Sequence, residues 1–243
     1  MMARPTRILL FDVDGTLVHA GGAGRRAVGR ALLLHLGQVD GSLAGLRLDG
    51  MTDRLIVREV LQVLGRPFDQ ALCDRVLGDY VRFLRDEIHG PGYRVLPGVT
   101  ALLSALASRG AAMGLCTGNV EEGARLKLAR GGLDGFFGWG EEAICGFAAD
   151  GEARERIVAA ALRRASRRLG RPVRPEEALV VGDTPRDVEA AHRMGVPALA
   201  VATGRFSVEE LRASGAEHVL PSLEGQLAAD LVLDGLDPRP GPG

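Results

Sequence analysis

Two aspartates, spaced one residue apart, follow a short apolar run near the start of the chain. Asp12 and Asp14 come directly after the run that ends at Phe11, and a glycine follows them. Because side chains alternate along an extended strand, both carboxylates point to the same side. Two like charges so close repel each other unless they share a cation or a proton. The pair therefore predicts a metal site with one acid ready for proton transfer.

A second apolar run ends in a hydroxyl, a glycine and an amide. These residues are Thr117, Gly118 and Asn119, and a threonine hydroxyl beside backbone amides at a helix N-terminus makes a site for an anion. The same three residues also form ordinary turns and helix caps. Asn119 is the only asparagine of the chain, which favours a functional role for this segment.

A third apolar run ends at Gly182 and is followed by Asp183, with Asp187 four residues later. Asp183 can reach a metal ion beside Asp12. Asp187 either belongs to the same group of carboxylates or is simply an acid that favours the positive end of a helix dipole. Oxygen ligands without histidine or cysteine companions select Mg²⁺ over zinc.

The apolar runs have strand length and alternate with helical patterns, which is typical of a parallel sheet covered by helices on both faces. We expect a doubly wound, Rossmann-like α/β core with strands at residues 7–11, 112–116, 178–182, 197–202 and 217–220. In such folds the site lies beyond the carboxyl ends of the strands. The three groups of polar residues are therefore predicted to meet at one edge.

Residues 18–92 interrupt this alternation, because they contain no convincing strand and read as three or four amphipathic helices. One of these helices is predicted to be capped by Thr52 and to run to Leu64. We predict that this block forms a helical cap over the site, on a core made of residues 1–17 and 93–235. The Pro/Gly-rich residues 236–243 are predicted to be a disordered tail.

Composition excludes several classes of partner and chemistry. The 30 basic and 31 acidic residues nearly cancel, and no basic cluster alternates with aromatics, so no nucleic-acid partner is expected. No apolar run is long enough to span a bilayer and no signal-peptide pattern begins the chain, which predicts a cytoplasmic protein without membrane contact. Three cysteines without paired spacing indicate neither a disulfide framework nor a zinc site.

The motifs resemble those of the haloacid dehalogenase superfamily in order and spacing, across about residues 7 to 205. The matching segments are Asp12-Val13-Asp14-Gly15-Thr16-Leu17, Thr117 and Gly182-Asp183-Thr184-Pro185-Arg186-Asp187. For the phosphatases of that family, the resemblance implies that Asp12 is the nucleophile and Asp14 the general acid/base. It also implies a Mg²⁺ site made of Asp12, Asp14, Asp183 and Asp187, with Asp14 binding through its backbone carbonyl. Thr117, Gly118 and Asn119 would hold the phosphoryl oxygens.

The helical block is similar to the family's helical cap, and residues 50–54 resemble its substrate-specificity loop, which implies substrate contacts for Thr52, Asp53 and Arg54. The departure lies in motif three, where the family usually places a lysine. The only lysine, Lys127, stands in the helix after motif two without an acidic partner at helical spacing. We therefore predict that Arg154 supplies this charge, with Arg156 and Lys127 as alternatives.

These expectations lead to a predicted function. The chain is expected to be a Mg²⁺-dependent phosphomonoester phosphatase, similar in layout to phosphoglycolate phosphatases, that acts on a small phosphorylated metabolite through an aspartyl-phosphate. A pyrophosphatase, a sugar-phosphate mutase of the same superfamily and an inactive ligand-binding member are the alternatives. In the mutases an arginine occupies the position of Asp53, which has the opposite charge. His19 either touches substrate or faces solvent.

Overall fold

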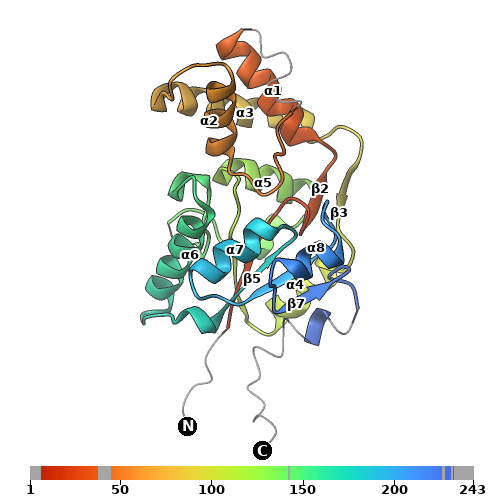
Figure 1. Ribbon diagram of the computed structural model, residues 1–243. Helices are drawn as coiled ribbons and strands as arrows, with labels where there is room; N and C mark the ends of the chain where they lie inside the picture. The colour runs from red at the N-terminus through yellow and green to blue at the C-terminus, as the bar shows by residue number, and fades with distance from the viewer. Residues whose placement is uncertain (1–6, 38–44, 142, 226–227, 231, 233–243) are drawn as a thin grey trace, which may run out of the picture.

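The fold is a five-stranded parallel sheet between two layers of helices (Figure 1). The computed structural model describes residues 7–37, 45–141, 143–225, 228–230 and 232; the predicted tail at 236–243 lies outside them. The strand order is β4-β1-β5-β6-β7 and every neighbouring pair is parallel. The bounds of the strands are β1 Ile8–Phe11, β4 Ala112–Leu115, β5 Ala178–Gly182, β6 Ala198–Val201 and β7 His218–Leu220. The predicted α/β class is confirmed, and each strand lies within one residue of its expected ends.

Alternate residues of the strands pack against opposite helical layers. Leu9 and Phe11 belong to one hydrophobic cluster with residues of α4 and α5, whereas Ile8 and Leu10 belong to a second cluster with residues of α6, α7 and α8. The bounds of these helices are α4 Val99–Ser108, α5 Glu121–Arg130, α6 Arg154–Leu169, α7 Pro185–Arg193 and α8 Val208–Ala213. Burial on both faces explains why the strands are continuous apolar runs.

Three further helices form a separate unit beyond the carboxyl ends of the strands (Figure 1). They are α1 Ala23–Leu36, α2 Asp53–Val63 and α3 Gln70–Glu87, and their buried apolar residues make a third cluster of their own. We call α1–α3 the helical unit. Thr52 caps α2 by accepting a hydrogen bond from the backbone N–H of Leu55.

A two-stranded antiparallel sheet stands where the chain enters and leaves the helical unit. β2 Val18–Ala20 pairs with β3 Tyr93–Val95, so the expectation that residues 18–92 contain no strand is wrong at 18–20. A three-residue strand is too short to show a period of two, and its partner lies more than 70 residues away. The pair fixes the base of the helical unit to the core.

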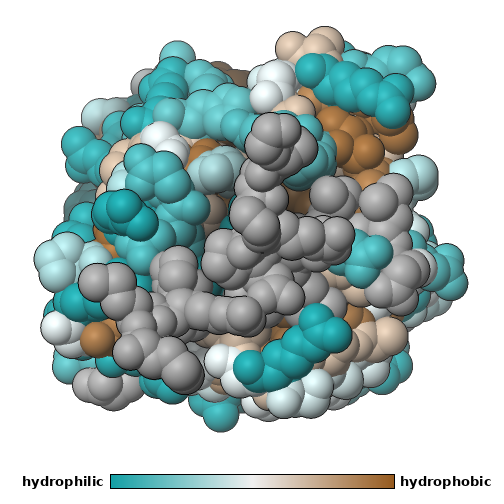
Figure 2. All heavy atoms as spheres, turned by 90° about the horizontal axis from the view of Figure 1, so that it is seen from below, coloured by the Kyte–Doolittle hydropathy of each residue, from teal (hydrophilic) through white to brown (hydrophobic). Residues whose placement is uncertain are grey.

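In the view of the opposite end of the molecule, most of the coloured residues are hydrophilic, and hydrophobic residues show in separate places (Figure 2). Among the described residues, no helix is both long and apolar enough to cross a membrane. The features that carry chemistry lie at the other end, between the sheet and the helical unit.

Candidate active site

Three carboxylates meet at the carboxyl edge of the sheet. Asp12 follows β1, Asp183 follows the neighbouring strand β5, and Asp187 lies in the first turn of α7. Each offers an oxygen within 4.8 Å of the other two, and all three residues are buried. The parallel pairing of β1 with β5 is what brings Asp12 and Asp183 side by side.

Asp187 takes part both in the cap of α7 and in the acidic cluster. Its Oδ2 accepts hydrogen bonds from the backbone N–H and the hydroxyl of Thr184, at 3.0 and 2.7 Å. The first of these bonds and the bond from the backbone N–H of Asp187 to Thr184 Oγ1 make the capping box of α7. Asp187 Oδ1 accepts a hydrogen bond from Arg154. The cap therefore orients one oxygen of Asp187 toward the helix and the other toward the cluster.

The cluster is short of positive charge. Burial raises the pKa of Asp12 to about 6; the nearby guanidinium of Arg154 opposes this effect, and Asp187 adds to it. Burial and the nearby carboxylates of Asp187 and Asp12 raise the pKa of Asp183 as well. Three buried carboxylates with one guanidinium are the arrangement that a bound cation stabilises.

The residues around Asp183 fit a metal ion. The donors are hard carboxylate oxygens, with no thiolate or imidazole in the cluster. Gly15 has a φ of +83°, and a Cβ at this position would collide with the carboxylate of Asp183. Only glycine therefore lets the turn after β1 approach the acidic cluster this closely.

The turn after β4 supplies the hydroxyl and the amide. Thr117 is fully buried, and the side-chain Nδ2 of Asn119 donates to Thr117 Oγ1 at 2.8 Å and to Asp14 Oδ2 at 2.9 Å. Because β4 pairs with the other side of β1, this turn lies next to the one that carries Asp12 and Asp14. The three neighbouring strands β4, β1 and β5 thus present the hydroxyl and the carboxylates at one edge.

Arg154 lies within the acidic cluster. It opens α6 and is 8% exposed. Its Nη2 lies 3.2 Å from Asp12 Oδ1 and contacts Asp187, while Nη1 donates to the backbone carbonyl of Gly50 at 3.3 Å. Arg156, the alternative considered from the sequence, is exposed and does not line the cavity that lies beside the acidic cluster.

Lys127 also lies in the site. It has no acidic partner at helical spacing on its own helix, but it pairs with an aspartate on another segment. Its Nζ is 2.6 Å from Asp14 Oδ2 and donates to Asn119 Oδ1 at 2.6 Å. Side chains of a helix point back toward its N-terminus, and α5 begins directly after the turn that carries Asn119. A search for partners on the same helix misses this geometry.

A loop of the helical unit docks onto the turn after β4. We call residues 48–53 the docking loop. The backbone N–H of Asp53 donates to the carbonyl of Gly118 at 2.7 Å, and its carboxylate accepts from the backbone N–H of Val120 at 2.7 Å. A Cβ on Gly118 would collide with the carbonyl of Met51. The absence of a side chain at Gly118 therefore permits the close approach of the loop.

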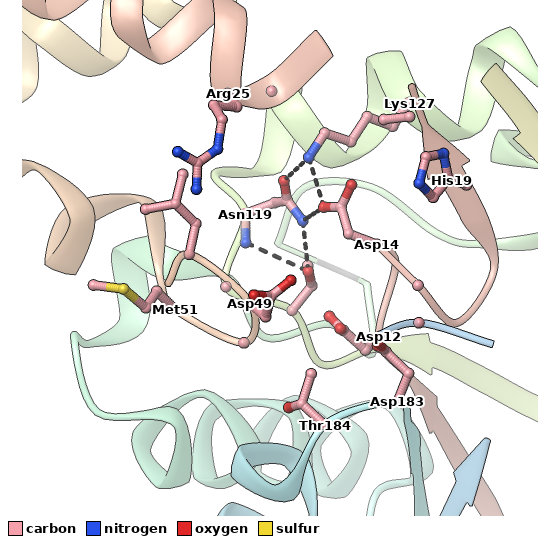
Figure 3. Close-up of a pocket in the computed structure, with 18 of the residues that line it drawn as sticks. Asp12, Asp14, His19, Arg25, Asp49, Met51, Asn119, Lys127, Asp183 and Thr184 are labelled. Atoms are coloured by element: carbon pink, nitrogen blue, oxygen red, sulfur yellow. Dashed lines mark hydrogen bonds and ion pairs between the residues drawn. The ribbon is translucent and has the colours of Figure 1, made fainter. Parts of the chain in front are cut away.

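The acidic cluster, the docking loop and the helical unit enclose a cavity of about 430 Å³ (Figure 3). Of the three loop residues expected to contact substrate, Asp53 lines it, but Thr52 and Arg54 do not. The Thr52 hydroxyl binds Leu55 and the carbonyl of Glu152, and Arg54 pairs with Asp74. This corrects the expectation for Thr52 and Arg54, whose side chains are engaged at the start of α2.

Several lining residues were not singled out from the sequence. They come from the helical unit, β3 and the loop after β6, and they include Arg25, Tyr80, Arg94 and Arg205. His19 is exposed on β2 and also lines the cavity. Figure 3 shows Arg25 reaching in from α1 on the side opposite Asp12 and Asp183. No motif marks these residues, because the packing of the helical unit brings them to the cavity.

The comparisons with known proteins agree with this geometry. A family model described as haloacid dehalogenase-like hydrolase matches residues 6–195. A phosphoglycolate phosphatase of Rhodospirillum rubrum is 34% identical, covering 86% of this chain and 85% of the relative. A phosphoglycolate phosphatase of Pseudomonas putida is 28% identical, covering 91% and 78%.

Solved structures show the same fold. A predicted phosphatase from Clostridium acetobutylicum superposes with a TM-score of 0.68 at 24% identity, covering 94% of this chain and 99% of the other. A hydrolase from Pseudomonas syringae gives a TM-score of 0.64 at 21% identity, covering 95% and 98%.

Proposed function

The chain belongs to the haloacid dehalogenase-like hydrolases, and we propose that it is a Mg²⁺-dependent phosphatase that hydrolyses a small phosphorylated metabolite through an aspartyl-phosphate on Asp12. The reaction class, hydrolysis of a phosphoric monoester, is that of its phosphoglycolate phosphatase relatives. The observation that carries the proposal is the meeting of Asp12, Asp14 and Thr117 at adjacent strand ends beside a cavity.

The proposed reaction has two steps. A carboxylate oxygen of Asp12 attacks phosphorus, the bond to the leaving oxygen breaks, and Asp14 gives that oxygen its proton. Water then attacks the aspartyl-phosphate while Asp14 takes up the proton of the water, which releases phosphate and regenerates Asp12. The contrast in burial supports these roles, because the Asp12 side chain is 6% exposed whereas the Asp14 side chain is 43% exposed and can exchange protons with groups in the cavity.

Asp12, Asp183 and Asp187 are proposed to hold Mg²⁺, with Asp14 contributing its backbone carbonyl. When bound, the ion neutralises the charge of the phosphoryl oxygens. Arg154 is proposed to keep the carboxylate of Asp12 in place and to offset its charge, since the guanidinium contacts Asp12 and Asp187. The Thr117 hydroxyl, which accepts a hydrogen bond from Asn119, keeps its own proton to donate to a phosphoryl oxygen.

The cavity supports a small substrate, and 2-phosphoglycolate is the first compound to test because the relatives carry the name phosphoglycolate phosphatase. Arg25, Arg94 and Arg205 line the cavity, which suits a substrate with negative charge. A pyrophosphatase, a mutase and an inactive binding member predict different products. A mutase is the least supported, because Asp53 places a carboxylate where those enzymes carry an arginine.

The test is a phosphate-release assay on the purified chain. We expect release from 2-phosphoglycolate and from an aryl phosphate with Mg²⁺, loss of release after chelation, and loss in Asp12→Asn. The matched control is Asp86→Asn, which changes an exposed aspartate on α3 and is expected to leave the rate unchanged. A preference for pyrophosphate, isomerisation of a sugar phosphate without release, or binding without turnover would each replace the proposal by the corresponding alternative.

A further inference from the structure

The site contains two buried cations that bind different carboxylates, and Figure 3 shows one of them, Lys127, beside Asp14 and Asn119. Arg154 contacts Asp12 and Asp187, and Lys127 contacts Asp14. We infer that Lys127 is a positioning residue for the proton transfer: it holds the carboxylate of Asp14 toward the leaving oxygen, while Arg154 serves the nucleophile. This inference rests on the proposed function, because it takes Asp14 to be the acid/base.

The contacts of Lys127 fix one of the two oxygens of Asp14. Oδ2 lies 2.6 Å from Lys127 Nζ and also accepts from Asn119 Nδ2 at 2.9 Å. Both of these bonds are made to Oδ2, and among the described residues neither Lys127 nor Asn119 bonds the other oxygen, Oδ1. The lysine side chain is 4% exposed, whereas that of Asp14 is 43% exposed. A buried anchor therefore holds a carboxylate whose second oxygen is available to a proton donor or acceptor in the cavity.

Lys127 also sets the orientation of the Asn119 amide. An ammonium group can only donate hydrogen bonds, so the amide oxygen of Asn119 must face Lys127. The amide nitrogen then faces both Asp14 and Thr117. One lysine thereby orders the carboxylate proposed for proton transfer and the hydroxyl proposed for phosphoryl binding. The sole lysine and the sole asparagine of the chain form one network.

The surroundings of Lys127 argue against a direct contact with the phosphoryl group. Two of the three ammonium protons are directed to Asp14 and Asn119. Tyr80 of α3 and Asp53 of the docking loop lie close enough to interact electrostatically with the same ammonium group. Lys127 lines the cavity, but its side chain is only 4% exposed. Its ammonium group is therefore surrounded mainly by protein partners.

The experiment measures kcat/KM for a series of phosphate monoesters whose leaving groups range from 4-nitrophenol to phenol to a simple alcohol. A good leaving group needs no proton, whereas an alcohol depends on the general acid. In Lys127→Met we expect about a 10²-fold loss for the alkyl phosphate and less than about a 5-fold loss for the 4-nitrophenyl ester. Arg154→Met should instead lower kcat/KM for all esters by a similar factor, because Asp12 attacks phosphorus in each of them.

Two further variants keep the test decisive. Asn119→Ala should shift the leaving-group dependence in the same direction as Lys127→Met, and it provides the measurement if the lysine variant does not fold. Arg125→Met removes an exposed cation from the same helix and is the control expected to leave the series unchanged. Equal losses for all leaving groups in both Lys127→Met and Asn119→Ala would contradict the positioning role of Lys127 but would leave the proposed function standing. A wild type that releases no phosphate would overturn the proposed function and this inference together.

Discussion

The two walls of the cavity are held in different ways. On the core wall, Asp12, Thr117 and Asp183 lie at the ends of three hydrogen-bonded strands, and the register of the sheet sets their relative positions. On the opposite wall, the docking loop and α1 reach the core through a few contacts, such as the backbone bond from Asp53 to Gly118. Chemistry is thus built into the sheet, whereas the shape of the cavity depends on how a second unit docks. Substitutions on the two walls should differ in kind as well as in size.

The largest effect is expected on the core wall, in Asp183→Asn. Turnover should fall by about 10³-fold or more, because this carboxylate is proposed to hold the metal. In addition, Mg²⁺ should raise the melting temperature of the wild type but not of the variant, since only a ligand bound to the folded state stabilises it. Calorimetry with and without Mg²⁺ provides this measurement.

The stability of Asp183→Asn without Mg²⁺ is a control on the sign of the expected change in stability. Burial and neighbouring carboxylates raise the pKa of Asp183, so its charge destabilises the folded protein when no cation is bound. Without Mg²⁺, Asp183→Asn should be at least as stable as the wild type. A destabilised apo variant, or one that retains the stabilisation by Mg²⁺, would contradict the proposed metal site.

The next largest effect is expected in Arg154→Met. Removal of one charge-stabilising contact typically costs about 10²- to 10³-fold in turnover, and here it leaves Asp12 and Asp187 without their shared guanidinium. Arg156→Met is the matched control, because Arg156 lies two residues away on the same helix and is exposed. Steady-state kinetics on both variants provides the measurement. A larger loss of turnover in Arg156→Met would contradict the assignment of the charge-stabilising role to Arg154.

The difference between the walls also explains what the sequence could predict. The positions of Asp12, Thr117 and Asp183 follow from apolar runs that end in polar residues, which is a local pattern. The contacts of Lys127 could not be predicted, because its partners are Asp14 and Asn119 on other segments, and no pattern along α5 indicates them. Such contacts exist only once the sheet is assembled.

The opposite wall, which the docking loop and α1 form and which we call the helical wall, was predicted less well for the same reason. Its helices follow from their apolar periodicity, and the cap at the start of α2 was recognised from Thr52. Which loop side chains face the cavity depends on the rotation of the docking loop against the core, so Asp53 lines the cavity and Arg54 does not. The short strand β2 was missed, because its pairing is long-range.

An intermediate effect is expected in Gly118→Ala, where the two walls touch. The added Cβ would collide with the carbonyl of Met51, and such overpacking typically costs about 1–3 kcal/mol. The docking loop should move away, which raises KM and changes the ranking of substrates while the Mg²⁺ dependence stays the same. The control is Gly135→Ala, where a Cβ meets no atom within 4 Å. A changed Mg²⁺ requirement in Gly118→Ala would show that the loop helps to build the metal site.

The smallest effect is expected for the ion pair that links α2 to the core. Arg58 donates to both carboxylate oxygens of Glu152 at 2.7 and 2.8 Å, which is the strong bidentate geometry. The two side chains are 39% and 31% exposed, however, so solvent screens the pair and its contribution should not exceed about 1 kcal/mol. Arg58 also stacks on the ring of Phe68, so a single substitution removes two interactions at once.

A double-mutant cycle separates these two interactions. The unfolding free energies of Arg58→Met, Glu152→Gln and the double variant give the coupling of the ion pair alone, because the contact with Phe68 is lost in both variants that lack Arg58 and cancels. We expect a coupling of up to about 1 kcal/mol, with turnover of an aryl phosphate close to that of the wild type. If the coupling exceeds about 2 kcal/mol, or if turnover falls as far as in Arg154→Met, the helical wall takes part in the chemistry and the distinction between the two walls fails.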